Sequence, residues 1–328
     1  MKREYRASKT RRGLLAALCA VPISFRSARG KAQPRQMELA SYFLGPTLRG
    51  KGMQLFADKV TEGSVGTIEV SLEIVAPTMP YHMLSRASDF AHYYPSLFAD
   101  IEPVFGLSAL PMLTATFDEA ETLLRIARPY YCFALARHGQ ILLATEPWQP
   151  GALWSTFRIR SIADLKDVPF AVSTPFAEQS GWGRIFLGSG ARRVSYFDAE
   201  LMLSHGYNQS VRFTQEFAYL TQIFFPAPLN FLTVSREVFD SLTEVQQQVL
   251  VSTACEIELE MWKLNRELLV RDCDDIAARG VTIDAQAPAD VLAALRAAAE
   301  PAIQSWARSV GADGPTIIAD YRHTVGRS

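Results

Sequence analysis

The chain has 328 residues, of which 48% are hydrophobic, and 33 Lys and Arg residues balance 34 Asp and Glu residues to a formal net charge of −1. A chain without a basic surplus or a basic stripe is not expected to bind nucleic acid. About 295 residues remain when a leader is set aside, which is more than one hydrophobic core usually holds and predicts two lobes.

Residues 1–32 are typical of an export signal rather than of a folded segment. Six basic residues precede position 13, and the apolar stretch 13–25 is shorter than the ~20 residues that a membrane span needs. Residues 30–32 offer small side chains for cleavage, and the Arg11-Arg12 pair also fits a twin-arginine signal. We therefore expect a periplasmic protein exported by a signal peptide, with the twin-arginine route left open.

The mature chain begins with alternating strands and helices. Its hydrophobic pattern predicts strands at 37–43, 67–74 and 89–91, and helices at 51–60 and 79–88. This order predicts a parallel sheet with helices on its faces.

The middle of the chain continues in the same way. Residues 117–128 predict a helix, and 130–136 and 140–145 predict buried strands. Further along, 194–196 predict a strand and 199–204 a helix.

A long helix is predicted near the C-terminus. Thr243 and Gln246 form a capping box, and no glycine or proline follows before Gly280. About 36 helical residues span about 54 Å, so the helix must touch both lobes or bend. Residues 281–283 then predict a short strand and 288–310 a last helix.

The sequence offers little for covalent chemistry. Its five histidines are scattered without metal-ligand spacing, and no nucleophile elbow occurs. We expect no cofactor and no metal, and we expect Cys132, Cys255 and Cys273 to be buried thiols.

Several motifs together resemble the periplasmic solute-binding proteins of TRAP transporters, often described as dicarboxylate-binding. They are the A-L-P-M run at 109–112, the W-x-x-G at 148–151, the S-x-x-D-L-K at 161–166, the Gly-Ala pair at 190–191 and the long helix. The resemblance implies an α/β fold of two lobes, with mixed and mostly parallel sheets flanked by helices and one long helix spanning both lobes.

The same resemblance suggests lobe boundaries. Lobe I is expected to contain residues 33–155 with part of 237–280, and lobe II residues 156–236 with part of 281–328. The long helix is expected at 244–279.

The implied function is that of an extracytoplasmic solute receptor, not an enzyme. Such a receptor captures a small organic molecule in an interlobe cleft, closes around it and delivers it to the integral membrane subunits of a TRAP transporter. A binding lobe of another importer or a sensor is the alternative, followed by an enzyme.

The solute is constrained by two departures from the family. The family's carboxylate-binding arginines fall on Ala171 and Leu153, so a buried carboxylate would lie unpaired there. Either the solute is neutral or less acidic, with an aromatic solute and an organic acid both left open, or another cation such as Arg212 reaches it.

The candidate pocket is expected to be aromatic, with polar contacts from the end of the strand at 170–172. Trp154 and Phe170 are considered as further lining, and two first-lobe residues, His82 and Asp89, are carried over from the resemblance. The candidate substrate-binding residues are Tyr42, His82, Asp89, Trp148, Ala171, Ser173, Thr174, Tyr196, Arg212, Phe217 and Tyr219.

Overall fold

The computed structural model describes residues 33–43, 45–75, 88–173, 182–205 and 211–327, with backbone only at 205, 211 and 212. The expected helix at 79–88 lies outside this part, apart from its last residue, as do His82 and Thr174. Only the backbone of Arg212 is described. These three site residues therefore stay predictions.

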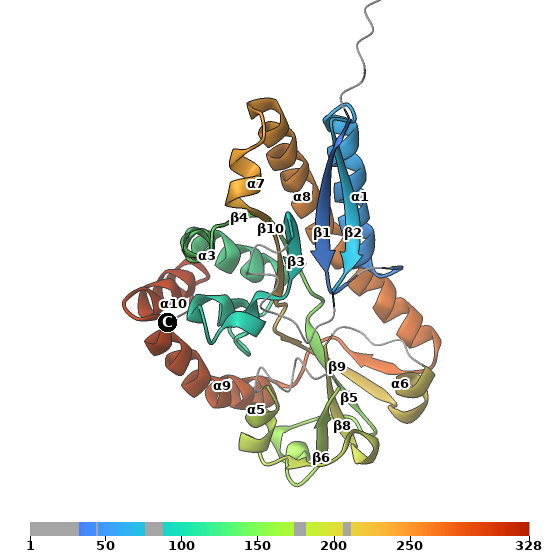
Figure 1. Cartoon of the computed structure of the whole chain (residues 1–328). Helices are drawn as coiled ribbons and strands as arrows, with labels where there is room; N and C mark the ends of the chain where they lie inside the picture. The colour runs from blue at the N-terminus through green and yellow to red at the C-terminus, as the bar shows by residue number, and fades with distance from the viewer. Residues whose placement is uncertain (1–32, 44, 76–87, 174–181, 206–210, 328) are drawn as a thin grey trace, which may run out of the picture. The chain divides into compact units, whose positions relative to one another are not determined.

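The first sheet has five strands in the order β2-β1-β3-β10-β4 (Figure 1). Its strands are β1 (Arg35–Ser41), β2 (Ile68–Ile74), β3 (Phe90–Tyr93), β4 (Gln140–Pro147) and β10 (Leu229–Ser235). β1 is parallel to β2 and β3, whereas β10 runs antiparallel to β3 and β4. The carboxyl ends of β1, β3 and β4 therefore share one edge with the start of β10.

The second sheet has six strands in the order β11-β9-β5-β8-β6-β7. They are β5 (Gly151–Ser155), β6 (Pro169–Val172), β7 (Arg192–Arg193), β8 (Leu201–His205), β9 (Tyr219–Phe225) and β11 (Thr282–Asp284). β5 runs antiparallel to both of its neighbours, and the other pairs are parallel. The predicted α/β fold with mixed sheets is confirmed, and five of the nine described strand pairs are parallel.

Two strands pair across the predicted lobe boundaries. β5 lies in the range predicted for lobe I but pairs in the second sheet, and β10 lies in the range predicted for lobe II but pairs in the first sheet. The chain changes sheets between Pro147 and Gly151, returns between Phe225 and Leu229, and changes again between Ser235 and Thr282. Residues 34–328 form one compact unit.

Helices cover the sheets. They are α1 (Leu48–Gly63), α3 (Phe117–Arg137), α5 (Gly183–Gly188), α6 (Val211–Glu216), α7 (Arg236–Asp240), α8 (Glu244–Ala278), α9 (Ala289–Val310) and α10 (Asp313–Thr324). Short 3-10 turns lie at Pro95–Phe98, Pro103–Ala109, Ile162–Leu165 and Tyr196–Asp198.

The long helix α8 is present over 35 residues, and the capping box of Thr243 and Gln246 opens it. Its first part packs against α1 and β4, where Leu250 and Met261 join the core beneath the first sheet. Its last part approaches β11, and Ile276 joins a core of the second sheet. One helix thus contributes to the cores of both sheets (Figure 1).

Three expected elements are wrong. Residues 130–136 belong to α3 and not to a strand, because Tyr131 and Leu135 face the core while Phe133 is 68% exposed, a helical and not an alternating pattern. The expected helix at 199–204 is largely β8, held by pairing to β5 and β6. The expected strand at 194–196 is replaced by the short β7 and a 3-10 turn.

The expected burial of the three mature-chain cysteines is also wrong. Cys132 and Cys255 are exposed, and Cys273 is half-buried; all three are free thiols. Cys132 and Cys255 lie on solvent-facing sides of α3 and α8, whose opposite sides supply the core.

Candidate functional site

Four buried polar side chains meet at the carboxyl edge of the first sheet. Ser41 ends β1 beside His92 of β3, and Glu146 of β4 pairs in register with Asn230 of β10. Their exposed fractions are at most 3%. Ligands of open α/β sheets lie at this kind of edge, because the loops after the strands converge there.

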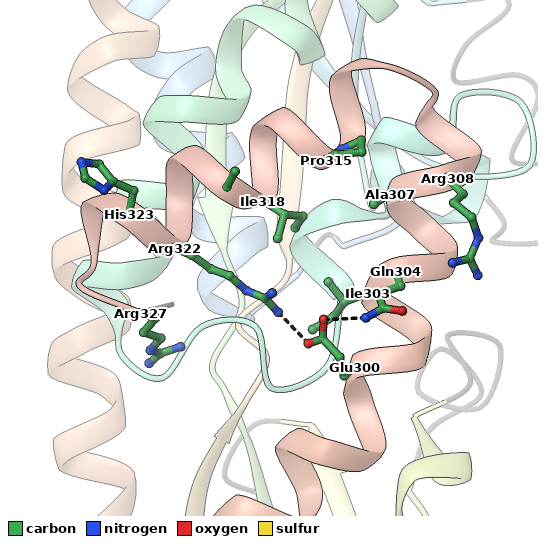
Figure 2. A pocket seen from close by; sticks show the side chains of 11 residues that line it. Glu300, Ile303, Gln304, Ala307, Arg308, Pro315, Ile318, Arg322, His323 and Arg327 are labelled. Carbon is green, nitrogen blue, oxygen red and sulfur yellow. Dashed lines mark hydrogen bonds and ion pairs between the residues drawn. The ribbon is translucent and has the colours of Figure 1, made fainter.

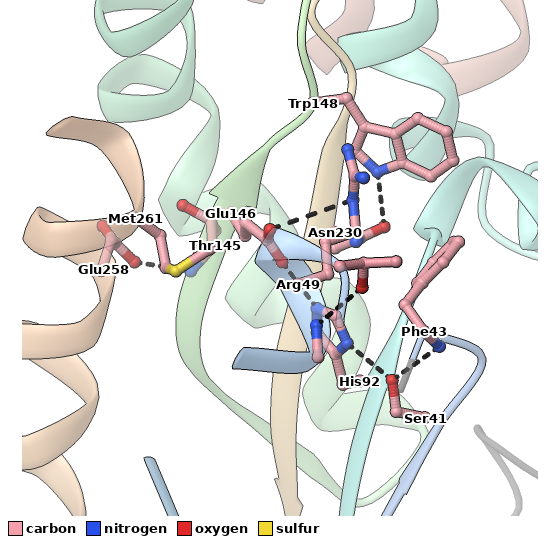
Figure 3. A network of polar contacts seen from close by, with 12 residues as sticks. Ser41, Phe43, Arg49, His92, Thr145, Glu146, Trp148, Asn230, Glu258 and Met261 are labelled. Carbon is pink, nitrogen blue, oxygen red and sulfur yellow. Dashed lines mark hydrogen bonds and ion pairs between the residues drawn. The ribbon is translucent and has the colours of Figure 1, made fainter. Parts of the chain in front are cut away.

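A chain of hydrogen bonds connects three of these polar side chains (Figure 3). The Phe43 N–H donates to Ser41 Oγ at 3.0 Å, and Ser41 Oγ lies 2.9 Å from His92 Nδ1. His92 Nε2 lies 3.0 Å from Glu146 Oε2. A carboxylate only accepts, so His92 carries a proton on Nε2, and in the neutral ring Nδ1 accepts from the Ser41 hydroxyl.

A cation reaches the same edge from the start of α1. Thr47 caps this helix by accepting from the Gly50 N–H at 3.0 Å, and Arg49 lies in the first turn. The Arg49 Cζ lies 4.2 Å from the ring centroid of Trp148, a cation–π geometry. Its Nε is 3.9 Å from Glu146 Oε1, which is an ion pair without a hydrogen bond.

Burial and the neighbouring carboxylate shift the pKa of Arg49 in opposite directions. Burial lowers the pKa of Arg49, and the negative charge of Glu146 raises it. A guanidinium keeps its proton under such a shift, so Arg49 remains a cation. The Arg49 side chain is 20% exposed, whereas that of Glu146 is 3% exposed.

Trp148 lies where the chain changes sheets. Its N–H donates to Pro228 O at 2.7 Å, which joins the outgoing and returning segments, and its Nε1 donates to Asn230 Oδ1 at 2.8 Å. Gly151 follows, and a Cβ there would lie 2.5 Å from Phe225 O. The glycine therefore permits the close approach of the two connections.

Several buried polar atoms of this edge have no hydrogen-bond partner among the described residues. They are Tyr42 OH, Arg49 Nε, Tyr93 OH, Thr145 Oγ1, Glu146 Oε1 and Asn230 Nδ2. Burial raises the pKa of Tyr42 to about 12. Each unpaired buried polar group costs about 1–3 kcal/mol, which is the kind of strain that a bound ligand can relieve.

The positions of the missing arginines are apolar. Leu153 is fully buried and Ala171 is 5% exposed, each within a hydrophobic core of the second sheet. Phe170, on the other face of β6 from Ala171, stacks on Phe186 at 4.7 Å between ring centroids. Neither arginine position supplies a charge for a ligand.

Three of the predicted aromatic residues pack together in a core of the second sheet. The ring centroids of Trp154 and Phe217 lie 6.5 Å apart, and Tyr196 packs against the same cluster. Tyr219 opens β9 opposite Ser155, at the edge away from Gly151. Ser173, just after β6, is at the Gly151 edge, and its buried Oγ has no partner among the described residues.

Asp89 lies at the starting edge of β3, away from His92. Its carboxylate accepts from the Glu38 N–H at 2.9 Å and so ties β3 to β1. Tyr42 and Trp148 are the predicted residues that the structure brings to the edge with Ser41 and His92.

Sequence reasoning missed Arg49, His92, Glu146 and Asn230. A lone arginine in a helix and a lone histidine carry no motif. The available signal was positional: the Gly45-Pro46 break places the start of α1 directly after β1, and His92 and Glu146 each lie near the end of a strand.

A separate hollow of about 680 Å³ lies between α9 and α10 (Figure 2). Its Glu300 already accepts from Arg322 Nη2 at 2.6 Å and from Gln304 Nε2 at 3.2 Å. Its lining comes from α9, α10 and Arg327 just after α10, away from the strand ends. We therefore place the candidate site at the strand edge.

Two further features bear on function. In the described part of the chain, no group of three or more His, Cys, Asp and Glu side chains could hold a metal ion. No described helix is long and apolar enough to cross a membrane.

Comparison of the fold with solved structures gives a consistent result. DctP7 of Bordetella pertussis, an extracytoplasmic solute receptor binding pyroglutamic acid, superimposes with a TM-score of 0.74 at 19% identity, over 88% of this chain and 99% of that one. A TRAP periplasmic solute binding protein from Ochrobactrum anthropi gives 0.76 at 17% identity, over 90% and 97%. This is the fold of a TRAP solute receptor.

The TRAP-receptor fold extends to TeaA, the ectoine-binding protein of the TeaABC transporter, with a TM-score of 0.74 at 13% identity, over 88% of this chain and 99% of that one. No family model and no curated protein matches the sequence. The resemblance read from the motifs is thus confirmed for the fold, at 13% to 19% sequence identity to these structures.

Proposed function

We propose that the protein is an extracytoplasmic solute receptor that captures a small organic molecule between its two sheets and delivers it to the membrane subunits of a TRAP transporter. The observation that carries this proposal is the edge cluster of Arg49, His92, Glu146, Trp148 and Asn230. It combines charges, an aromatic face and unpaired buried polar atoms at the point where the chain passes between the sheets.

The solutes named for similar structures support a small organic ligand. Pyroglutamate, ectoine and D-glucuronate are named for three of these proteins. All three are small and polar, a size that a strand-edge cluster can hold.

The proposed mechanism uses the connections between the sheets. Trp148 and Pro228 join two of them by a hydrogen bond, and α8 is a third that packs on both cores. We expect the two halves to rotate about these connections. A solute that contacts both halves stabilises the closed form by its differential contacts with that form. The basic and apolar segment at 1–32 supports export to the periplasm.

An enzyme is the weaker alternative. Ser41, His92 and Glu146 lie in hydrogen-bonding order, as in a nucleophilic triad. Ser41 is completely buried, however, and its Oγ accepts from the Phe43 N–H. Its hydroxyl is thus held between a backbone donor and His92, and we expect this chain of bonds to position Glu146.

Native mass spectrometry of protein purified without unfolding tests the proposal. We expect a complex heavier than the polypeptide by one small organic molecule, released on denaturation. A binding lobe of another importer or of a sensor would also retain a solute. Neighbouring genes for a small four-helix and a large multi-span membrane protein distinguish the TRAP receptor, whereas an ATPase or kinase gene favours the alternative.

A further inference from the structure

We infer that the solute is a zwitterion, with one cationic group and one carboxylate, and that Glu146 and Arg49 select it. This inference rests on the proposed function and names the ligand class of the same site. It is carried by the charge balance, by the aromatic surroundings of Arg49 and by the unpaired atoms of the cluster.

The ion pair at this edge carries no net charge, because Arg49 contributes one positive charge and Glu146 one negative charge. Beside this pair, a monocarboxylate adds one negative charge to a largely buried site, and a dicarboxylate adds two. A zwitterion adds no net charge, so it escapes the desolvation penalty of an unpaired ion.

The surroundings of Arg49 form a seat for a cation. Its Cζ lies 4.2 Å from the Trp148 ring centroid and 5.5 Å from that of Phe43, and these rings meet edge to face at 5.3 Å. The Glu146 carboxylate lies alongside. Aromatic faces beside an acid recognise ammonium groups, and here the chain's own guanidinium occupies that position.

Arg49 is held in this seat without any hydrogen bond to a described residue, and its Nε is buried and unpaired. A solute cation that takes the seat therefore breaks no hydrogen bond of Arg49. Rotation of the partly exposed side chain then lets the guanidinium pair with the solute carboxylate in a fork of two hydrogen bonds.

The unpaired atoms match the two ends of such a solute. Glu146 Oε1 is a buried acceptor and suits an ammonium donor, whereas Asn230 Nδ2 is a buried donor and suits a carboxylate. Glu146 and Asn230 are 3% and 0% exposed. One zwitterion thus supplies a partner for an acceptor and a donor that the described residues leave unpaired, while the displaced Arg49 adds its own bonds to the carboxylate.

Identification of the retained solute, followed by titration, tests the inference. Protein stripped of solute by unfolding and refolding is titrated calorimetrically with glycine betaine, L-proline, 4-aminobutyrate, lactate, benzoate and succinate, together with the identified solute. We expect a zwitterion as the retained molecule and binding only by zwitterionic probes. Glu146→Gln and Arg49→Met should each weaken this binding about 30-fold or more.

Glu256→Gln is the matched control, because this exposed acid of α8 pairs with Lys59 at 2.8 Å, outside the cluster. Its affinity should equal that of the unchanged protein. A retained carboxylic acid without a cationic group, or unchanged affinity in Glu146→Gln, overturns the inference and leaves the receptor function standing. Absence of any retained or titrated solute overturns both.

Discussion

Trp148 Nε1 lies 2.8 Å from Asn230 Oδ1, and this bond ties the segment that leaves the first sheet to the strand that returns to it. The same indole carries the Arg49 guanidinium on its face. One side chain therefore links the connection between the sheets to the charged edge where we place the solute.

Replacing that indole should separate binding from stability. Trp148→Phe keeps a ring but removes the donor to Asn230, so we expect a loss of about 1–3 kcal/mol in urea unfolding and weaker solute retention. Trp306→Phe is the control, because Trp306 Nε1 donates to Pro103 O at 2.7 Å away from the edge. Equal solute retention in both variants would show that Trp148 does not belong to the solute-binding site.

A second prediction concerns the close approach at the sheet crossing. In Gly151→Ala the new Cβ would lie 2.5 Å from Phe225 O, so the two connections must move apart. We expect destabilisation of about 1–3 kcal/mol by urea unfolding, as in overpacked cores. In Gly188→Ala the nearest atom would be Ala298 Cβ at 3.8 Å, and stability should hardly change. Similar stability of the two variants would contradict the crossing geometry.

A third prediction is a pH dependence at Glu102, which is buried. Burial would raise its pKa, but hydrogen bonds from Arg137 and His138 outweigh burial and lower it. Because the pKa of Glu102 is lower in the folded than in the unfolded state, its ionisation stabilises the folded protein at pH values above the unfolded pKa of about 4.3. This contribution is lost as the pH falls through the folded pKa.

Glu102→Gln should therefore be less stable than the unchanged protein by about 2 kcal/mol at pH 7. The difference should shrink as the pH falls toward the lowered folded pKa, as urea unfolding at a series of pH values would show. A difference that is constant with pH would show that the charge of Glu102 does not matter.

The free thiols give a fourth prediction. Cys132 and Cys255 are exposed, whereas Cys273 is half-buried and accepts from Gln222 Nε2 at 3.2 Å. In protein lacking residues 1–32, a thiol reagent should modify two cysteines rapidly and the third slowly. Cys273→Ser should remove only the slow phase, and loss of a fast phase instead would contradict the orientation of α3 or α8.

The fold was predictable where local signals agreed with tertiary packing. Thr243 and Gln246 predicted the start of α8, because a capping box and an uninterrupted helical stretch are both local features of the sequence. Residues 130–136 were wrongly predicted to be a strand, because an aromatic, uncharged run is typical of strands. The burial of Tyr131 and Leu135 on one side of α3 depends on partners far along the chain.

The site was predictable only in part. Tyr42 and Trp148 were found because a strand end and a W-x-x-G motif marked them. Arg49, His92 and Glu146 come from three elements, and only the parallel order of β1, β3 and β4 brings them together. The expectation that Ala171 supplies no charge agrees with its buried, apolar surroundings, and Arg49 of α1 supplies a cation to the edge cluster instead.

The measurement that tests the central claim most directly is small-angle X-ray scattering of solute-free protein before and after its own retained solute is returned. We predict that the radius of gyration falls on addition of the solute, because the solute stabilises a closed arrangement of the two halves. Saturating binding of the solute with an unchanged radius of gyration would contradict a receptor that works by closure.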